Sequence, residues 1–386
     1  MLSKAKSARL ESTRQVEALP RRDEGKKKRV VVALSGGVDS AVAAFLLKKQ
    51  GYEIIGMFMK LWAEDENRCC DINSLECARK TAAKLSIPFY VVDLKKEFKK
   101  IVVNDYLCQY SQCKTPNPCV ICNKFIKFDL LFKKAKGLGA EFLATGHYAR
   151  IARELKTKKL KLKISKDKNK DQTYFLWTLT QNQLKQILFP IGDYTKKEVR
   201  NIALKNHLPS FNRPESQGIC FLGNMNQKEF LSRFIKFKAG PIVDLRGDVI
   251  GKHAGLPFYT IGQRKGLTEL RIKNKELRKK GETPPMYVVK MDQKNNTLIV
   301  GEEKELYKKE LFVKNINWIS GRPPKTRNVG AKIRYGHPIV KSKITNPKSK
   351  NKIEIIFNRP VRAVTPGQSI VFYSQDEVLG GGIIWK

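Results

Sequence analysis

The sequence is short of acidic residues and has no long apolar run. Its 386 residues contain 36 Asp and Glu against 76 Lys and Arg, so the formal net charge is +40. No apolar stretch approaches the roughly 18 residues that a membrane span needs, and the N-terminus lacks the apolar core of a secretory signal. These absences predict a soluble, cytoplasmic protein with no membrane partner.

Internal repeats and heptad patterns are also absent, and the composition, 41% hydrophobic and 9% aromatic, is that of a globular chain with room for two or three domains. Residues 1–28 are polar and carry mixed charges, which predicts a flexible basic tail and argues against an acid-poor transit peptide. Eight cysteines in a chain without a secretory signal indicate reactive or metal-binding thiols rather than a disulfide framework.

The excess of positive charge indicates a polyanionic partner, and nucleic acid is the first candidate. Lysine is spread evenly along the chain, so a general compositional bias toward lysine is the alternative explanation.

A glycine-rich turn follows the short β-branched run 29–34. The turn is Ser35-Gly36-Gly37-Val38-Asp39-Ser40, and a helical pattern begins at Ala41 and stops at Gly51. A turn that leads into a helix N-terminus presents backbone N–H groups to an anion, which suits phosphate. The lysine that a Walker A loop requires is missing. The turn resembles instead the SGGxDS pyrophosphate loop (PP-loop) of the ATP-pyrophosphatase superfamily, whose members transfer AMP to a carbonyl oxygen. The alternative is an ordinary strand-to-helix turn.

Strand and helix patterns alternate after the loop, at 53–62, 73–85, 88–94 and 141–145. This alternation predicts an α/β fold with a doubly wound parallel sheet over residues 29–210. Ligands bind beyond the carboxyl ends of the strands in such sheets, which places the loop, Met59 and Thr145-Gly146-His147 around one site. Met59 lines an adenine pocket in this interpretation, and the alternative is a core methionine.

A hairpin is predicted at 149–155 and 159–164, where alternation leaves Lys159, Lys161 and Lys163 on one face. These lysines either guide a phosphate backbone or form a solvated face. Beyond residue 210, short strands and glycines predict a small β-rich central domain at 211–283 and a C-terminal β-barrel at 284–386.

Three cysteines are candidates for chemistry. Cys119 and Cys122 follow the proline-stiffened loop Thr115-Pro116-Asn117-Pro118, and Cys220 lies near the second domain boundary. Zinc bound by Cys108, Cys113, Cys119 and Cys122 is an alternative, although the spacing is irregular for zinc. Inert buried thiols are the other alternative, and Cys69, Cys70 and Cys77 are interpreted in that way.

The chain from Lys28 to Lys386 resembles the tRNA-specific 2-thiouridylases. The segments that carry the resemblance are ALSGGVDSAVAAFLLKKQGYEIIGMFMKLW, KTPNPCVICNKFIKF, ATGHYAR, KDQTYFLW, SQGICFLG, YTIGQRKGL and AVTPGQSIVFY, in family order. These enzymes replace the C2 oxygen of the wobble uridine of certain tRNAs with sulfur.

The resemblance implies a set of site residues. ATP is expected at Ala33, Leu34, Ser35, Gly36, Gly37, Val38, Asp39, Ser40, Met59 and Gly146, with Asp39 also in the catalytic set beside Mg²⁺. The target base is expected at Asn117, Pro118 and Cys119, and other tRNA contacts at His147, Lys170, Asp171, Gln172, Arg334, Tyr335 and Gln368. Cys122 and Cys220 match the two essential cysteines of the family.

The expected reaction follows from the leaving group. A urea-like carbonyl oxygen leaves poorly, so adenylation by ATP converts it to AMP, which a sulfur nucleophile displaces. AMP and pyrophosphate are the products, and a sulfur-donor protein is implied as a partner beside tRNA.

The resemblance supports two sulfur routes. One is a persulfide on Cys220 resolved by Cys122, and the other is a four-iron four-sulfur cluster held by Cys119, Cys122 and Cys220. Some family members have aspartate at the position of Cys119. Because three thiols from two segments leave one iron open, we expect these cysteines to converge. The rival functions are another tRNA thiolase, a ligase or amidotransferase with a different acceptor, and a noncatalytic RNA-binding protein.

Overall fold

A parallel five-stranded sheet forms the N-terminal domain of the computed structural model, which describes residues 27–64, 72–154, 158–215, 218–223, 225–267, 285–346 and 352–385. Its strand order is β3-β2-β1-β4-β7, built from β1 (Arg29–Ala33), β2 (Glu53–Lys60), β3 (Phe89–Asp93), β4 (Phe142–Ala144) and β7 (Ile187–Leu188). The central strand β1 is buried on both faces because Val30, Val31 and Val32 alternate between two cores. The predicted doubly wound α/β domain is confirmed.

The expected tail lies almost entirely in 1–26, and the interpretation of Cys69 and Cys70 falls in 65–71, both outside the described residues.

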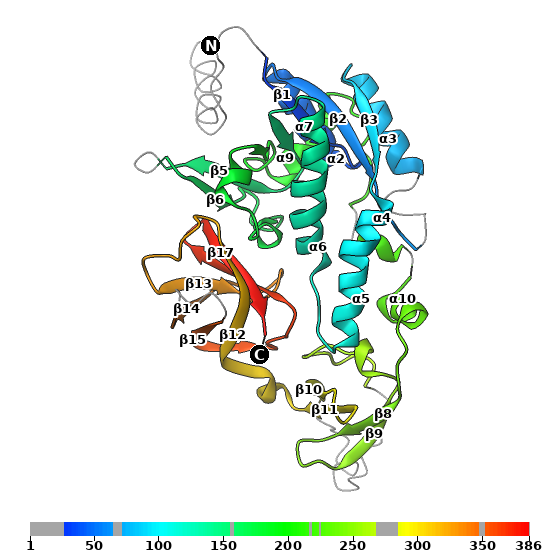
Figure 1. Cartoon of the computed structure of the whole chain (residues 1–386), viewed down its shortest axis with the longest axis vertical. Coiled ribbons are helices and arrows are strands. Elements are labelled where there is room, and N and C mark those ends of the chain that lie inside the picture. Colours follow the sequence, from blue (N-terminus) through cyan, green and yellow to red (C-terminus); the bar gives the residue numbers. More distant parts are fainter. Residues whose placement is uncertain are drawn as a thin grey trace, which may run out of the picture.

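Helices cover this sheet and extend from it (Figure 1). Those near the sheet are α2 (Val38–Lys49), α3 (Ile72–Lys84), α8 (Gln181–Leu184) and α9 (Lys196–Lys205), with the short turn η3 (Thr173–Phe175). Two helical runs descend toward the central domain. They consist of α4 (Lys95–Phe98), η1 (Lys99–Val103) and α5 (Asn104–Ser111), and of α6 (Pro118–Ile121), η2 (Cys122–Leu131) and α7 (Phe132–Gly137).

The central domain contains a four-stranded sheet of order β10-β11-β8-β9. Its elements are η4 (Cys220–Leu222), α10 (Gln227–Phe234), β8 (Gly240–Val243), β9 (Val249–His253), η5 (Leu256–Phe258), β10 (Tyr287–Asp292) and β11 (Thr297–Gly301). The sequence pattern assigned β10 and β11 to the C-terminal barrel, beyond a boundary at 283. They belong to the central sheet, because β11 pairs in parallel with β8 and Leu298 shares an apolar cluster with Ile242.

The C-terminal domain is a closed barrel, as expected. It follows η6 (Glu303–Leu306) and comprises β12 (Tyr307–Trp318), β13 (Asn328–Lys332), β14 (Val340–Ile344), β15 (Ile353–Arg362), β16 (Ser369–Ser374) and β17 (Glu377–Ile384). The order β12-β15-β14-β13-β16-β17 is closed by pairing between β12 and β17, so the barrel has no open edge among these strands. Ile355, Phe357 and Phe372 are fully buried inside it.

The lysine hairpin joins two domains. Strands β5 (Ala149–Arg153) and β6 (Leu160–Ile164) pair with each other as predicted, and β6 also pairs with β17 of the barrel. Lys161 Nζ lies 2.8 Å from Glu154 and 3.0 Å from Glu377, and Lys163 Nζ lies 3.0 Å from Asp376. These charges are compensated at a domain junction, which favours a structural role over a face for RNA.

Exchanging Lys161 and Lys163 together for methionine should leave the salt dependence of tRNA binding unchanged, because both pair with carboxylates at the junction between β6 and β17. A lysine that neutralised a phosphate would contribute roughly −0.9 to the log–log slope. Filter binding at several salt concentrations measures this slope, with Lys170→Met as the comparison. If the magnitude of the slope falls by about two in the double variant, Lys161 and Lys163 contact the RNA backbone after all.

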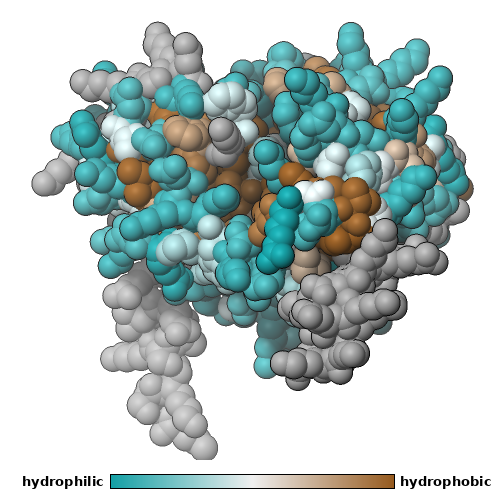
Figure 2. All heavy atoms as spheres, turned by 90° about the horizontal axis from the view of Figure 1, so that it is seen from below, coloured by the Kyte–Doolittle hydropathy of each residue, from teal (hydrophilic) through white to brown (hydrophobic). Residues whose placement is uncertain are grey.

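The surface agrees with the composition. Seen from below, the molecule is mostly hydrophilic, with hydrophobic groups gathered in a few places (Figure 2). None of the helices in the described ranges combines the length and the apolar character that crossing a bilayer requires.

Candidate active site

The glycine-rich turn lies at the carboxyl end of β1 and runs into α2. Gly36 has φ +78°, and an added Cβ would collide with the backbone of Ser74, so this position requires glycine. The Ser40 hydroxyl donates to the Gly37 carbonyl at 3.0 Å and accepts from the Ser35 N–H at 3.2 Å. These bonds hold the turn in a fixed shape at a helix N-terminus, as an anion-binding turn requires.

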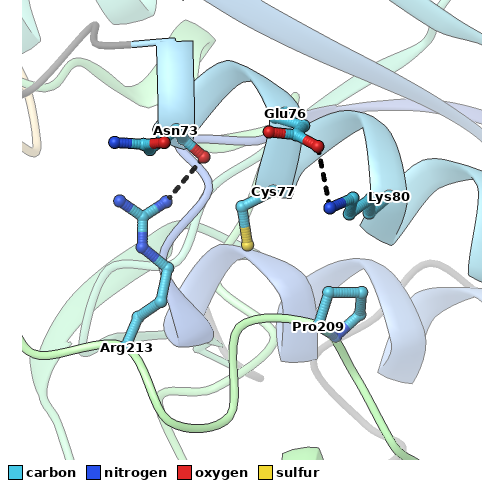
Figure 3. A pocket seen from close by; sticks show the side chains of 6 residues that line it. All are labelled: Asn73, Glu76, Cys77, Lys80, Pro209 and Arg213. Atoms are coloured by element: carbon cyan, nitrogen blue, oxygen red, sulfur yellow. Dashed lines mark hydrogen bonds and ion pairs between the residues drawn. The ribbon is translucent and has the colours of Figure 1, made fainter.

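Arg213 supports the turn from outside. Its guanidinium donates to the carbonyls of Gly36 at 3.4 Å and Asn73 at 3.2 Å and to the Ser74 hydroxyl at 3.1 Å. It lines a pocket of about 260 Å³, together with Asn73, Glu76, Cys77, Lys80 and Pro209 (Figure 3). Because Arg213 bonds to the Gly36 carbonyl of the turn, it stabilises the backbone conformation of the loop.

Gly146 packs against the beginning of α2. A Cβ at this position would lie 2.7 Å from Asp39 C and from Ser40 N, both backbone atoms. The chain after β4 therefore passes in close contact with the loop at Gly146. Strands β1, β2 and β4 are parallel neighbours, so they bring the loop, Met59 and Gly146 to one end of the sheet.

Gly146→Ala should impair ATP use and destabilise the protein by about 1–3 kcal/mol, because two backbone atoms cannot move aside as a flexible side chain does. Thermal unfolding and pyrophosphate release measure the two effects. Gly137→Ala is the matched control, since nothing lies within 4 Å of its added Cβ. Equal behaviour of the two variants would contradict a close approach at Gly146.

Asp39 is held by two side chains that were not among the predicted site residues, Tyr148 and Lys196. The Tyr148 hydroxyl donates to its carboxylate at 2.8 Å, and Lys196 Nζ lies 2.7 Å and 2.8 Å from its two oxygens. Burial raises the pKa of Tyr148, with the Asp39 charge adding to the effect, so this hydroxyl stays protonated and donates. In the sequence, Lys196 and Lys197 resemble a pair of solvent-exposed lysines at the start of a helix. The capping box formed by Thr195 and Glu198 was the available signal, because it fixes where α9 begins.

Further ion pairs connect this region to a second group of predicted residues. Glu215 lies 3.4 Å from Lys196 and 2.7 Å from Lys170, and the Lys170 ammonium lowers the pKa of Glu215. The ring of Tyr335, from the barrel, lies 4.7 Å from the ring of Phe175. Lys170 is thus linked through Glu215 and Lys196 to Asp39 of the loop.

Other predicted contacts face inward. Asp171 is buried and accepts from the Thr173 hydroxyl at 2.7 Å, and Gln172 accepts from the Tyr148 N–H at 2.9 Å. His147 lies 2.7 Å from the Thr145 hydroxyl, and burial lowers its pKa well below the usual range. Arg334 donates to the Ala363 carbonyl at 2.7 Å. In this structure these side chains shape the loops around the site.

The cysteine loop is held by the barrel. Gln368 donates to the carbonyls of Thr115 at 3.0 Å and Pro116 at 3.1 Å. Asn117 then caps α6, because its side chain accepts from the Val120 N–H, and Pro118 occupies the first turn. Proline stiffening and contacts between domains together fix where the helix with Cys119 and Cys122 begins.

Two of the three candidate cysteines share an environment. Cys122 is 8% exposed in an apolar cluster with Phe98, Tyr106 and Phe221, and Cys220 packs against the same cluster. Cys119 is exposed. Across the part of the chain that the structure describes, no three Cys, His, Asp or Glu side chains are grouped to hold a metal ion. The expected convergence of all three thiols on an iron–sulfur cluster is therefore not seen, and the four cysteines of the zinc alternative do not form such a group in the described residues either.

Family comparisons agree with this architecture. Residues 28–224 match the tRNA methyl transferase HUP domain, residues 228–302 the tRNA methyl transferase PRC-barrel domain, and residues 308–384 the aminomethyltransferase beta-barrel domain. The tRNA-specific 2-thiouridylase MnmA of Halothermothrix orenii is 45% identical over 366 residues, 92% of this chain and 98% of the relative. That of Clostridioides difficile is 43% identical over 367 residues, 93% of this chain and 98% of the relative. The chain belongs to the tRNA-specific 2-thiouridylase family.

Proposed function

We propose that this protein is a tRNA 2-thiouridine synthase. It uses ATP to adenylate the C2 oxygen of the wobble uridine, replaces that oxygen with sulfur, and releases AMP and pyrophosphate. Because tRNA and ATP are its substrates, we place it in the cytoplasm.

One observation carries the proposal beyond family membership. The loop at the end of β1 and Met59 near the end of β2 lie at the same edge of the sheet, and Met59 packs against the cluster that contains Cys122 and Cys220. The apolar cluster of the two thiols thus borders Met59 near the end of β2, which supports a site at the end of the sheet where ligands bind in such folds.

The loop residues 33–40 bind the triphosphate, with Met59 and Gly146 beside the adenosine. The uridine oxygen attacks the α-phosphorus, the bond to the β-phosphate oxygen breaks, and pyrophosphate leaves. Backbone N–H groups at the start of α2 stabilise the charge that develops. Mg²⁺, when bound, would be held by Asp39 and would neutralise charge on the departing pyrophosphate.

The tRNA reaches this site along the ion-paired surface beside Lys170. Lys170 and Tyr335 supply a charge and a partly exposed ring to the RNA. Asn117, Pro118 and Cys119 lie on the loop that receives the base, and Gln368 and Arg334 hold surrounding backbone. We assign His147, Asp171 and Gln172 to shaping this surface, since their side chains face the protein.

Sulfur transfer fits the buried Cys122 and the half-buried Cys220, and we derive no step through an iron–sulfur cluster. A sulfur-donor protein leaves a persulfide on Cys220. Its terminal sulfur attacks C2, and the C2–O bond breaks with AMP as the leaving group. The Cys122 thiolate then attacks the Cys220 sulfur, releases the 2-thiocarbonyl and forms a Cys122–Cys220 disulfide, which a dithiol reductant restores.

Mass spectrometry of tRNA nucleosides from a deletion strain tests the function. We expect 2-thiouridine to disappear and to return on complementation. Purified protein with ATP, tRNA and a persulfide donor should form AMP and 2-thiouridine in equal amounts. Unchanged 2-thiouridine in the deletion strain would contradict the proposal, and a different modified nucleoside would favour a ligase or amidotransferase.

A further inference from the structure

Lys196 is fixed beside the nucleotide loop by its own helix. It is the first residue of α9, behind the Thr195 capping box, and its backbone N–H donates to Asp167 at 3.0 Å. Val199 and Ala203 of the same helix are fully buried in one apolar cluster with Val42 and Leu46 of α2. Because α9 packs on the helix that the loop begins, the Lys196 side chain has a defined direction toward the loop.

The Lys196 ammonium is enclosed by carboxylates and an aromatic ring. Its side chain is 12% exposed, it contacts both oxygens of Asp39, and Glu215 lies 3.4 Å away. The Tyr148 ring centre is 5.8 Å from Nζ. A largely desolvated ammonium needs an anionic partner at all times, because an unpaired charge in this position is costly.

Binding of a nucleotide would change that partner. Asp39 is the carboxylate that would hold Mg²⁺, and a metal ion on its oxygens would repel the ammonium that now lies 2.7 Å away. A triphosphate on the loop brings new anionic oxygens to the same place. The loop lacks the lysine that Walker A sequences use for such oxygens, and the Arg213 guanidinium is engaged by backbone carbonyls.

We propose that Lys196 contacts the β- and γ-phosphate oxygens of ATP and stabilises the departing pyrophosphate, and that the Asp39 pair seen in this structure keeps its ammonium in place until ATP binds. Lys196, at the start of α9, would thus take the role that the loop lysine has in a Walker A sequence. The inference rests on the proposed use of ATP.

The test compares Lys196→Met with Lys196→Arg and with the exposed neighbour Lys197→Met. Calorimetry with α,β-methylene ATP and Mg²⁺ reports nucleotide affinity, and pyrophosphate release with tRNA reports adenylation. We expect Lys196→Met to weaken analogue binding at least tenfold and to slow pyrophosphate release by ~100-fold or more, the size of a lost charge-stabilising donor. Lys196→Arg should recover part of both, and Lys197→Met should match the wild type.

A double-mutant cycle separates direct contact from an effect through Asp39. If Lys196 binds phosphate, Lys196→Met should weaken analogue binding also in an Asp39→Asn background. If its effect disappears in that background, Lys196 only holds Asp39 and the inference is wrong. It is also wrong if Lys196→Met alone binds the analogue as the wild type does. Failure of the proposed function looks different, because then the wild-type protein itself would release no pyrophosphate with tRNA and ATP.

Discussion

Asp39→Ala should abolish the release of AMP and pyrophosphate while leaving tRNA affinity nearly unchanged. Its carboxylate lies at the start of α2, 2.7 Å from Lys196 and 2.8 Å from the Tyr148 hydroxyl, where metal and pyrophosphate are expected to meet. Lys170 and Tyr335, our proposed RNA contacts, do not bond to it. We expect a loss of ~100-fold or more, as for other charge-stabilising groups in active sites.

Pyrophosphate release and filter binding, measured on the same preparation, decide this prediction. Asp193→Ala is a suitable control, because Asp193 is a half-exposed carboxylate whose ion pair is to Arg150 at 3.8 Å. Wild-type AMP production by Asp39→Ala would remove the loop carboxylate from the mechanism. A parallel loss of tRNA binding would instead indicate that the variant damages the fold.

Cys220→Ser and Cys122→Ser should each eliminate 2-thiouridine while leaving the adenylation step intact. One pyrophosphate per bound tRNA should still be released, because the thiols act after adenylation. Cys119→Ser should be nearly silent, since Cys119 is exposed whereas Cys122 and Cys220 share the apolar cluster. The apolar cluster against which Cys122 and the half-buried Cys220 pack limits the access of water and oxidants to the persulfide.

Thiolation assays and iron quantification after anaerobic reconstitution measure the outcome. Cys108→Ser is the control for a second exposed thiol. If Cys119→Ser lowers iron content and thiolation together, the three cysteines do form a cluster in the working enzyme and the persulfide route is wrong. A Cys122–Cys220 disulfide after turnover without added reductant is the product that the persulfide route predicts.

Several features could be read from the sequence because they depend on neighbouring residues alone. The buried β1, the glycine turn and the glycine that stops α2 are predicted where they occur. Helix α2 ends at Lys49, and Gly51, whose φ is +84°, follows its C-cap. The hairpin at Ala149–Ile164 was predicted for the same reason, since alternation of side chains is a local property. The parallel sheet followed from the order of these elements.

Other features depend on contacts between segments that are distant in sequence, and the pattern of neighbouring residues does not predict such contacts. The alternating lysines of β6 are identical in sequence whether they face RNA or the acidic residues of the barrel. Strands β10 and β11 have the texture of barrel strands, and only pairing with β8 assigns them to the central sheet.

The sequence by itself determined the α/β domain and the glycine-rich turn, and it named the thiols that we propose to be reactive, because each of these is encoded in a short run of residues. Only the tertiary structure decided which side chains meet. It brought Lys196 to Asp39 across 157 positions of sequence, placed Cys220 with Cys122 in one apolar cluster and left Cys119 at the surface. Such partners are selected by the packing of whole helices and domains, and burial decides which charges and thiols are shielded from water.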